Sequence, residues 1–158
     1  MKRNVLVSQC LLGASCRYDG RSVGKEAVCK AACEMGWIPV CPEQLGGLCT
    51  PRSPAERVGE RIINRAGEDV TDAFRRGAEE ALRLAKLYGA GYALLKEKSP
   101  SCGSGIIYDG TFSGSLTEGF GVTAELFANA GIRVYGETQL DELINQLKWD
   151  EENDSIQL

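Results

Sequence analysis

Seven cysteines and the absence of histidine set the chemistry that is open to this chain. Without an imidazole, the chain lacks the usual general base, the usual zinc or copper ligand and the usual partner of a serine or cysteine nucleophile. Thiolates remain as soft metal ligands, and clusters of them favour zinc or iron–sulfur sites. The cysteines occupy positions 10, 16, 29, 33, 41, 49 and 102. An odd number of thiols does not indicate a disulfide framework, so we interpret them as ligands, nucleophiles or core residues.

Three of these thiols come directly after predicted strands. Cys10 follows a short apolar strand at residues 4–8, Cys41 closes a second strand at 37–41, and Cys102 follows a third strand at 91–96 through a short loop. In open parallel sheets, ligands bind outside the carboxyl ends of the strands. We therefore expect Cys10, Cys41 and Cys102 to converge at one edge of a sheet.

The other cysteines are less informative. Cys29 and Cys33 are four residues apart on a predicted helix, and we favour the interpretation that they are small core residues. Cys16 and Cys49 lie in the glycine-containing loops that also carry Cys10 and Cys41. For these two, lining the site and merely packing remain equally open.

Polar residues beside the three strand-end thiols complete the candidate site. Glu43, two residues after Cys41, is placed to act as a general base toward water, although a surface carboxylate or a helix cap would look the same. Ser99 and Ser101 stand beside Cys102. They are candidates for hydrogen bonding a substrate or moving a proton, and serines also serve ordinary turns.

Alternating strand and helix patterns predict the elements that position these residues. The apolar periodicity predicts helices at 24–35, 70–88 and 121–130, a last helix from Thr138, further strands at 105–109 and 132–135, and a β-ribbon around 61–64. This alternation predicts a single Rossmann-like α/β domain over residues 1–148, with a mostly parallel sheet and helices on both faces. The proline inside 37–41 indicates an irregular or an edge strand. Residues 149–158 are acidic, and we expect a disordered tail there.

Charge and hydropathy narrow the class of partner. The 158 residues carry a net charge of −4, and an acidic chain lacks the basic surface that attracts nucleic acid. No apolar run reaches the length of a membrane span, and the start does not read as a signal peptide. We expect a cytoplasmic protein, monomeric or homodimeric, that acts on a small molecule rather than on nucleic acid or a membrane.

The spacing of the thiols leaves several kinds of site open. No CxxC pair occurs, so a four-cysteine zinc site has no support from spacing. A 4Fe–4S cluster normally takes four thiolates, and three would leave one soft, Lewis-acidic iron open to a substrate. Three alternatives remain. They are another enzyme chemistry on the same cluster site, such as a dehydration or a reaction of a different thio-substrate, a zinc-stabilised or redox-sensing module without catalysis, and a metal-free thiol enzyme with Cys102 as nucleophile.

Five segments together resemble the thiouracil desulfidase family over roughly residues 3–145. They are SQCLLGASCRYDG, CPEQLGGLCTPRSPAE, DVTDAFRRGAE, LLKEKSPSCGSGIIYDGTF and GFGVTAELFANAGI. The resemblance implies a 4Fe–4S cluster held by Cys10, Cys41 and Cys102, with one iron open. It implies non-redox conversion of a thiolated pyrimidine such as 2-thiouracil to uracil and hydrosulfide.

The resemblance also implies roles for the polar residues. Glu43 would activate the water, and Ser99 or Ser101 would assist with protons. Some relatives carry an extra domain and act on thiolated nucleosides in RNA. Because this chain has no such domain and no basic stretch, a free base or nucleoside is the expected substrate.

Overall fold

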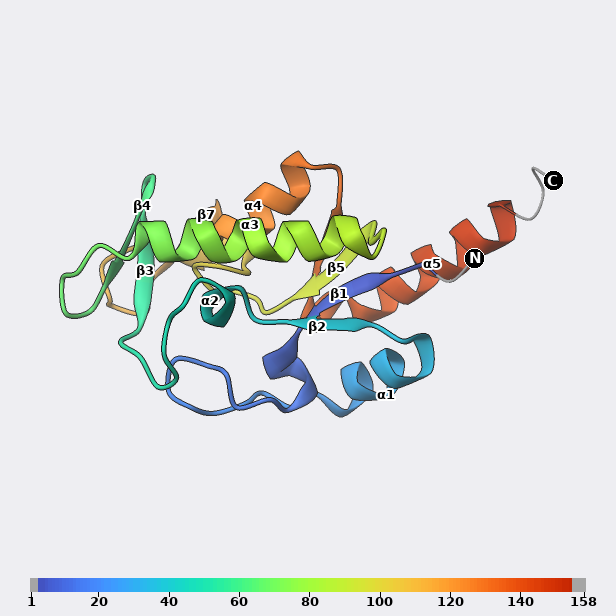
Figure 1. Cartoon of the computed structure of the whole chain (residues 1–158), viewed down its shortest axis with the longest axis horizontal. Coiled ribbons are helices and arrows are strands. Elements are labelled where there is room, and N and C mark those ends of the chain that lie inside the picture. The colour runs from blue at the N-terminus through green and yellow to red at the C-terminus, as the bar shows by residue number, and fades with distance from the viewer. Residues whose placement is uncertain (1–2, 155–158) are drawn as a thin grey trace.

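A four-stranded parallel sheet forms the centre of the structure, a computed structural model that describes residues 3–154 (Figure 1). Its strands lie in the order β2-β1-β5-β8, and every neighbouring pair is parallel. They are β1 (Val5–Ser8), β2 (Ile38–Val40), β5 (Tyr92–Leu95) and β8 (Arg133–Gly136). The predicted α/β fold with a parallel sheet is confirmed, and the proline-containing β2 is an edge strand as expected. The finer Rossmann-like assignment stays a prediction.

Helices cover both faces of this sheet. They are α1 (Glu26–Met35), α3 (Thr71–Leu87), α4 (Val122–Asn129) and α5 (Leu140–Asp154). Alternate residues of a strand point to opposite faces. Accordingly, Val5 and Val7 pack with residues of α1 and α5, whereas Leu6 packs with residues of α3 and α4. The strand β1 is buried on both sides, as a parallel sheet requires.

Two antiparallel ribbons lie outside the sheet. They are β3 (Ala55–Val58) with β4 (Arg61–Asn64), and β6 (Ser104–Tyr108) with β7 (Leu116–Phe120). The ribbon predicted around residues 61–64 is confirmed. The strand predicted at 105–109 exists, but it pairs with β7 rather than with the parallel sheet. The sequence analysis missed β7 because its residues are mostly exposed and show no apolar alternation.

The last helix is longer than predicted. Residues 149–154, expected to be disordered, continue α5 to Asp154, while residues 155–158 lie outside the described part of the chain. Leu143 and Leu147 of α5 are buried against the sheet. Near its end, the Tyr92 hydroxyl donates to the Asp150 carboxylate, and the Arg3 guanidinium donates to the Asp150 carbonyl oxygen at 3.2 Å. These contacts hold the acidic segment in helical form.

The short helix α2 (Pro42–Leu45) follows β2 and lies directly on α3. A Cβ atom added at Gly77 would stand 1.8 Å from the Pro42 carbonyl oxygen, and one at Gly46 would stand 2.0 Å from the Ala73 carbonyl oxygen. Glycine at both positions therefore lets the two backbones touch. This contact fixes the height of α2 above the sheet, and with it the place of Glu43.

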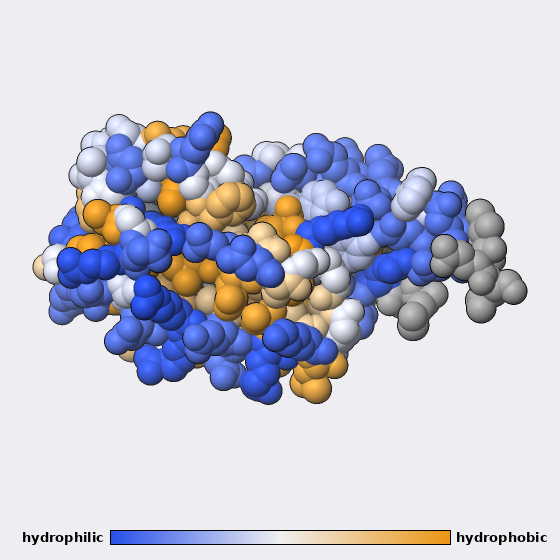
Figure 2. All heavy atoms as spheres, turned by 90° about the horizontal axis from the view of Figure 1, so that it is seen from above, coloured by the Kyte–Doolittle hydropathy of each residue, from blue (hydrophilic) through white to orange (hydrophobic). Residues whose placement is uncertain are grey.

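Two single-turn helices complete the described elements, η1 (Gln9–Leu12) after β1 and η2 (Glu137–Gln139) after β8. Seen from the α4 side, hydrophilic side chains cover most of the molecule, and apolar atoms gather in a band across the middle of that face (Figure 2). Within residues 3–154, no helix combines the length and the apolar character that crossing a membrane requires.

Candidate active site

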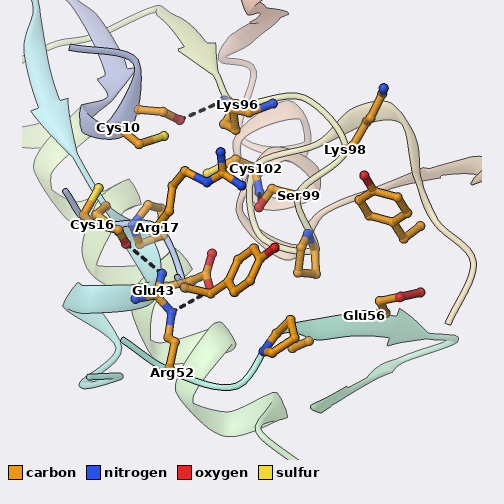
Figure 3. A pocket seen from close by; sticks show the side chains of 18 of the residues that line it. Cys10, Cys16, Arg17, Glu43, Arg52, Glu56, Lys96, Lys98, Ser99 and Cys102 are labelled. Atoms are coloured by element: carbon orange, nitrogen blue, oxygen red, sulfur yellow. Dashed lines mark hydrogen bonds and ion pairs between the residues drawn. The ribbon is translucent and has the colours of Figure 1, made fainter. Parts of the chain in front are cut away.

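A cavity of about 490 Å³ opens at the carboxyl ends of β1, β2 and β5. Cys10 in η1, Cys41 after β2 and Cys102 after β5 all line it (Figure 3). The predicted convergence of these thiols at one edge of the sheet is therefore found in the structure. Glu43 and Ser99 line the same cavity.

The structure distinguishes Cys16 from Cys49, for which the sequence did not decide between lining the site and packing. Cys16 is buried and lines the cavity, whereas Cys49 is exposed and is absent from its lining. The expectation that Cys33 is a core residue is wrong, because α1 turns that thiol outward and buries Val28 instead. Cys29 is half-buried, and its thiol donates to the Leu11 carbonyl oxygen at 3.7 Å.

Three of the thiols that line the cavity, those of Cys16, Cys41 and Cys102, have pKa values above the ordinary value of a thiol. Burial raises the pKa of Cys102 to about 12, although the hydroxyls of Ser8 and Ser101 act in the opposite direction. The neighbouring Cys16 side chain and then burial raise the pKa of Cys41, and contact with Cys10 is the main cause that raises the pKa of Cys16. A catalytic cysteine nucleophile instead needs a lowered pKa, so this environment disfavours the metal-free thiol enzyme.

The loop that carries Cys102 is fixed by Ser99 and by the start of α4. The Ser99 hydroxyl oxygen accepts hydrogen bonds from the backbone N–H groups of Ser101 at 3.1 Å and Cys102 at 3.0 Å. The N–H groups of Val122 and Thr123, which have no partner within α4, donate to carbonyl oxygens of residues 100 and 101 at 2.9 and 2.8 Å. These hydrogen bonds link the loop that carries Cys102 to the N-terminal end of α4.

The two candidate serines have different surroundings. Ser99 is half-buried and lines the cavity. Ser101 is only 1% exposed, its hydroxyl forms a 2.9 Å hydrogen bond with the Thr123 hydroxyl, and it is absent from the cavity lining. The structure thus brings Ser99, and not Ser101, to the same space as Glu43.

Arg52 joins the loop of Cys16 to the helix α2, which carries Glu43. Its guanidinium donates to Glu43 Oε1 at 3.1 Å, to the Cys16 carbonyl oxygen at 2.9 Å and to the Cys49 carbonyl oxygen at 3.1 Å. Its backbone N–H donates to the Tyr18 carbonyl oxygen at 2.8 Å. One largely buried side chain therefore sets the position of this loop relative to α2.

The Glu43 carboxylate points into the cavity from α2 (Figure 3). Burial raises the pKa of this carboxyl group above its ordinary value, and the charge and hydrogen bond of Arg52 offset only part of that rise. A raised pKa makes a carboxylate a better proton acceptor near neutral pH than an exposed one.

Several residues of the cavity were not singled out by the sequence analysis. Ser8, at the end of β1, accepts a hydrogen bond from the Lys96 N–H at 2.9 Å and stands beside Cys102. Its place at the end of a strand was a usable signal. Glu56 comes from β3, and Phe112 comes from the connection between β6 and β7. Phe112 was not singled out because the pairing of β6 with β7 was missed.

The thiols surround the cavity and do not meet at a point. Among residues 3–154, no three or more histidine, cysteine, aspartate or glutamate side chains converge as the ligands of a single metal ion do. In Figure 3, Cys10 and Cys16 lie at one end of the cavity, and Glu56 and Lys98 lie at the other.

Comparison with known proteins gives consistent matches. The family model described as 2-thiouracil desulfurase matches residues 5–139. The uncharacterized protein YbbK of Bacillus subtilis (strain 168) is 45% identical over 150 residues, which are 89% of this chain and 99% of the relative. A solved structure of the 4Fe–4S-dependent thiouracil desulfidase TudS matches with a TM-score of 0.90 and 48% identity, over 94% of this chain and 99% of that one.

Proposed function

This chain belongs to the 2-thiouracil desulfurase family, and on that basis we propose that it is an iron–sulfur-dependent desulfidase that replaces the sulfur of a thiolated pyrimidine with oxygen. The observation that carries the proposal is that one cavity is lined by Cys10, Cys41 and Cys102, from three separate strand ends, and also by Glu43. The similar TudS is a 4Fe–4S-dependent thiouracil desulfidase, so 2-thiouracil is the reference substrate. The non-catalytic zinc or redox module is not favoured.

The donor set of the cavity fits an iron–sulfur cluster. Thiolates are the protein ligands that such clusters take, and the irons of a cluster occupy a volume rather than a point. We assign Cys10, Cys41 and Cys102 as the ligands of a 4Fe–4S cluster, and we place Cys16 beside them without a ligand role. A cluster held by these three cysteines would supply a soft, Lewis-acidic iron, a type of centre that suits a sulfur-containing substrate.

Glu43 is assigned as the general base. Its Oε1 is fixed by Arg52, and we assign Oε2 to the proton that a water molecule loses as it adds to the ring carbon. Water supplies the oxygen of the product, and the sulfur leaves as hydrosulfide. No electrons are gained or lost over the whole reaction, so no reductant is needed.

Ser99 is assigned to proton transfer in preference to Ser101. The backbone N–H groups of Ser101 and Cys102 donate to the Ser99 oxygen, and this arrangement leaves the hydroxyl proton to be donated to an acceptor in the cavity. Ser101, with its hydroxyl paired to Thr123, is assigned to support of the loop.

The size of the cavity suits a small substrate together with a cofactor. Ligand sites commonly enclose about 300–1,000 Å³, and this one encloses about 490 Å³. We propose a free thiolated base or nucleoside as the substrate.

The test is turnover of 2-thiouracil by protein reconstituted anaerobically with iron and sulfide, in water enriched in ¹⁸O and without a reductant. The proposal predicts one hydrosulfide released for each uracil formed, and uracil that carries one labelled oxygen. Release of sulfide only when a reductant is added, or no release at all, would contradict it.

A further inference from the structure

The backbone at the far end of the cavity adopts a conformation that bulky residues rarely take. Among the described residues, two that are not glycine have positive φ angles, Lys98 at 65° and Phe112 at 55°. Both line the cavity. A positive φ is sterically unfavourable for a residue with a large side chain, and residues held this way tend to occur at functional sites.

The strained turn at Phe112 is held by a buried carboxylate. Glu56 of β3 is only 6% exposed, and its Oε1 accepts hydrogen bonds from the backbone N–H groups of Gly110 at 3.2 Å and Phe112 at 3.1 Å. A Cβ atom added at Gly110 would stand 3.0 Å from the Arg57 carbonyl oxygen, so the tip of the β6–β7 hairpin lies tightly against the β3–β4 ribbon. One side chain thus fixes the connection between the two ribbons.

The ring of Phe112 also has a charged neighbour, which lies over it. The Arg65 guanidinium carbon lies 5.6 Å from the centroid of the ring, within the range of a cation–π contact. Arg65 directly follows β4 and lines the cavity as well. The backbone of Phe112 is therefore positioned by Glu56 of β3, and its ring by Arg65.

Other aromatic residues of the cavity do not have this support. Tyr18 and Tyr108 also line it, and each is more than a third exposed, with ordinary backbone angles. Phe112 is half-buried. Because its position is maintained against an unfavourable backbone geometry, it is the aromatic residue for which a function at the cavity is best supported.

We infer that Phe112 forms the wall against which the flat ring of the pyrimidine packs, and that Glu56 is the positioning residue that holds Phe112 in place. This inference rests on the proposed function, because it presumes a heteroaromatic substrate. Glu56 lies at the end of the cavity opposite Cys10 and Cys16 (Figure 3). A ring that packs there shares the cavity with the thiols, so its thiocarbonyl sulfur can be directed toward them.

The test compares the KM for 2-thiouracil in reconstituted wild-type protein with that in Phe112→Leu, Phe112→Tyr and Phe120→Leu. Stacking of a base on an aromatic side chain is worth about 1–3 kcal/mol, so we expect the KM to rise about tenfold in Phe112→Leu, with kcat and iron content unchanged. Phe112→Tyr keeps the ring and should stay within about twofold of wild type. Phe120 is exposed on the same hairpin and does not line the cavity, so Phe120→Leu is the matched control and should change nothing.

Two variants of Glu56 provide a second test, because one should impair substrate binding and the other should preserve it. Glu56→Ala removes the acceptor of both N–H groups and should raise the KM as Phe112→Leu does. Glu56→Gln keeps an oxygen at the position that both N–H groups use, so it should restore the wild-type KM. A merely structural role of Glu56 would lower stability in both variants without this difference in KM.

Equilibrium binding of uracil, measured by calorimetry in the same proteins, separates this inference from the proposed function because it needs no turnover. Weaker binding in Phe112→Leu, by about tenfold relative to wild type, supports the inference even if 2-thiouracil is not turned over. Equal affinities in wild type and Phe112→Leu, or no uracil binding to wild type, would overturn it.

Discussion

The guanidinium of Arg52 donates to the Glu43 carboxylate at 3.1 Å from a position in which it is only 8% exposed. The same guanidinium also holds the carbonyl oxygen of Cys16. The proposed base and the loop that carries two of the cavity thiols are therefore oriented by one cation. Lysine could not replace it, because a single ammonium group cannot match the planar fork of donors.

Replacing Arg52 by methionine should destabilise the protein and impair its activity. Removing one partner of a buried ion pair leaves the other uncompensated, which costs about 3–5 kcal/mol, and Glu43 loses the charge that opposes the rise of its pKa. Chemical denaturation measures the loss. Arg83→Met is the control, because Arg83 pairs with Glu80 on the exposed face of α3, where such pairs contribute at most about 1 kcal/mol. Equal losses in both variants would contradict the role of Arg52.

The two serines beside Cys102 should respond differently to alanine substitution. Ser99→Ala should lower kcat by about a hundredfold, in the range of general acid–base catalysis. Because the Ser99 oxygen also accepts the N–H groups of Ser101 and Cys102, kcat is compared per bound iron. Ser101→Ala should leave most of kcat but lower the free energy of unfolding by about 1–3 kcal/mol, because the buried Thr123 hydroxyl loses its partner. Steady-state kinetics and thermal unfolding of both variants check this, and the reverse pattern would transfer the proton-transfer role to Ser101.

Much of this site could be predicted from the sequence because the apolar runs show where the strands end. Apolar runs place β1, β2 and β5, and the geometry of parallel sheets then brings Cys10, Cys41 and Cys102 together. Cys16 and Cys49 could not be told apart, because both lie in loops whose path depends on Arg52 rather than on local propensity.

Other features lie beyond what periodicity can reveal. The exposed strand β7 has no apolar alternation, so the hairpin that brings Phe112 to the cavity was not predicted. Ser99 and Ser101 are two residues apart and chemically identical. Only the docking of their loop on α4, where Thr123 takes the Ser101 hydroxyl, distinguishes them. Residues 149–154 were predicted to be a tail because the contact that holds them, between Asp150 and Tyr92, joins residues 58 positions apart in the sequence.

Gly77→Ala should disturb the site although Gly77 does not line the cavity. The new Cβ atom would stand 1.8 Å from the Pro42 carbonyl oxygen, so α2 must move away from α3 and carry Glu43 with it. We expect a loss of about 1–3 kcal/mol of stability, as for other overpacked contacts, and a lower kcat. Gly91→Ala is the matched control, since a Cβ atom there meets nothing within 4 Å. The prediction is checked by measuring the unfolding and the activity of both variants. A Gly77→Ala protein with the stability and kcat of wild type would contradict the close contact between α2 and α3.

The N-terminal end of α3 should make an acid-sensitive contribution to stability. Hydrogen bonds from the Thr71 hydroxyl and backbone, and then the bond from Arg61, lower the pKa of Asp69 from its ordinary value of 3.8 to about 2. Because the pKa is lower in the folded state, the contribution is present above pH 3.8 and is lost as the pH falls from there through about 2. Thermal unfolding should show Asp69→Asn less stable than wild type at pH 7, with most of the difference lost by about pH 2. A difference that is as large at that pH as at pH 7 would contradict the assignment.

The most direct test of the central claim is the iron and sulfide content of anaerobically reconstituted protein, measured with hydrosulfide release from 2-thiouracil on the same samples. The proposed ligands predict about four irons per chain in wild type, with both cluster and turnover lost in serine variants of Cys10, Cys41 and Cys102. The exposed Cys49 provides the control, and Cys49→Ser should match wild type in both measurements. A full iron content in any of the three ligand variants, its loss in Cys49→Ser, or stoichiometric zinc in place of iron would contradict the account.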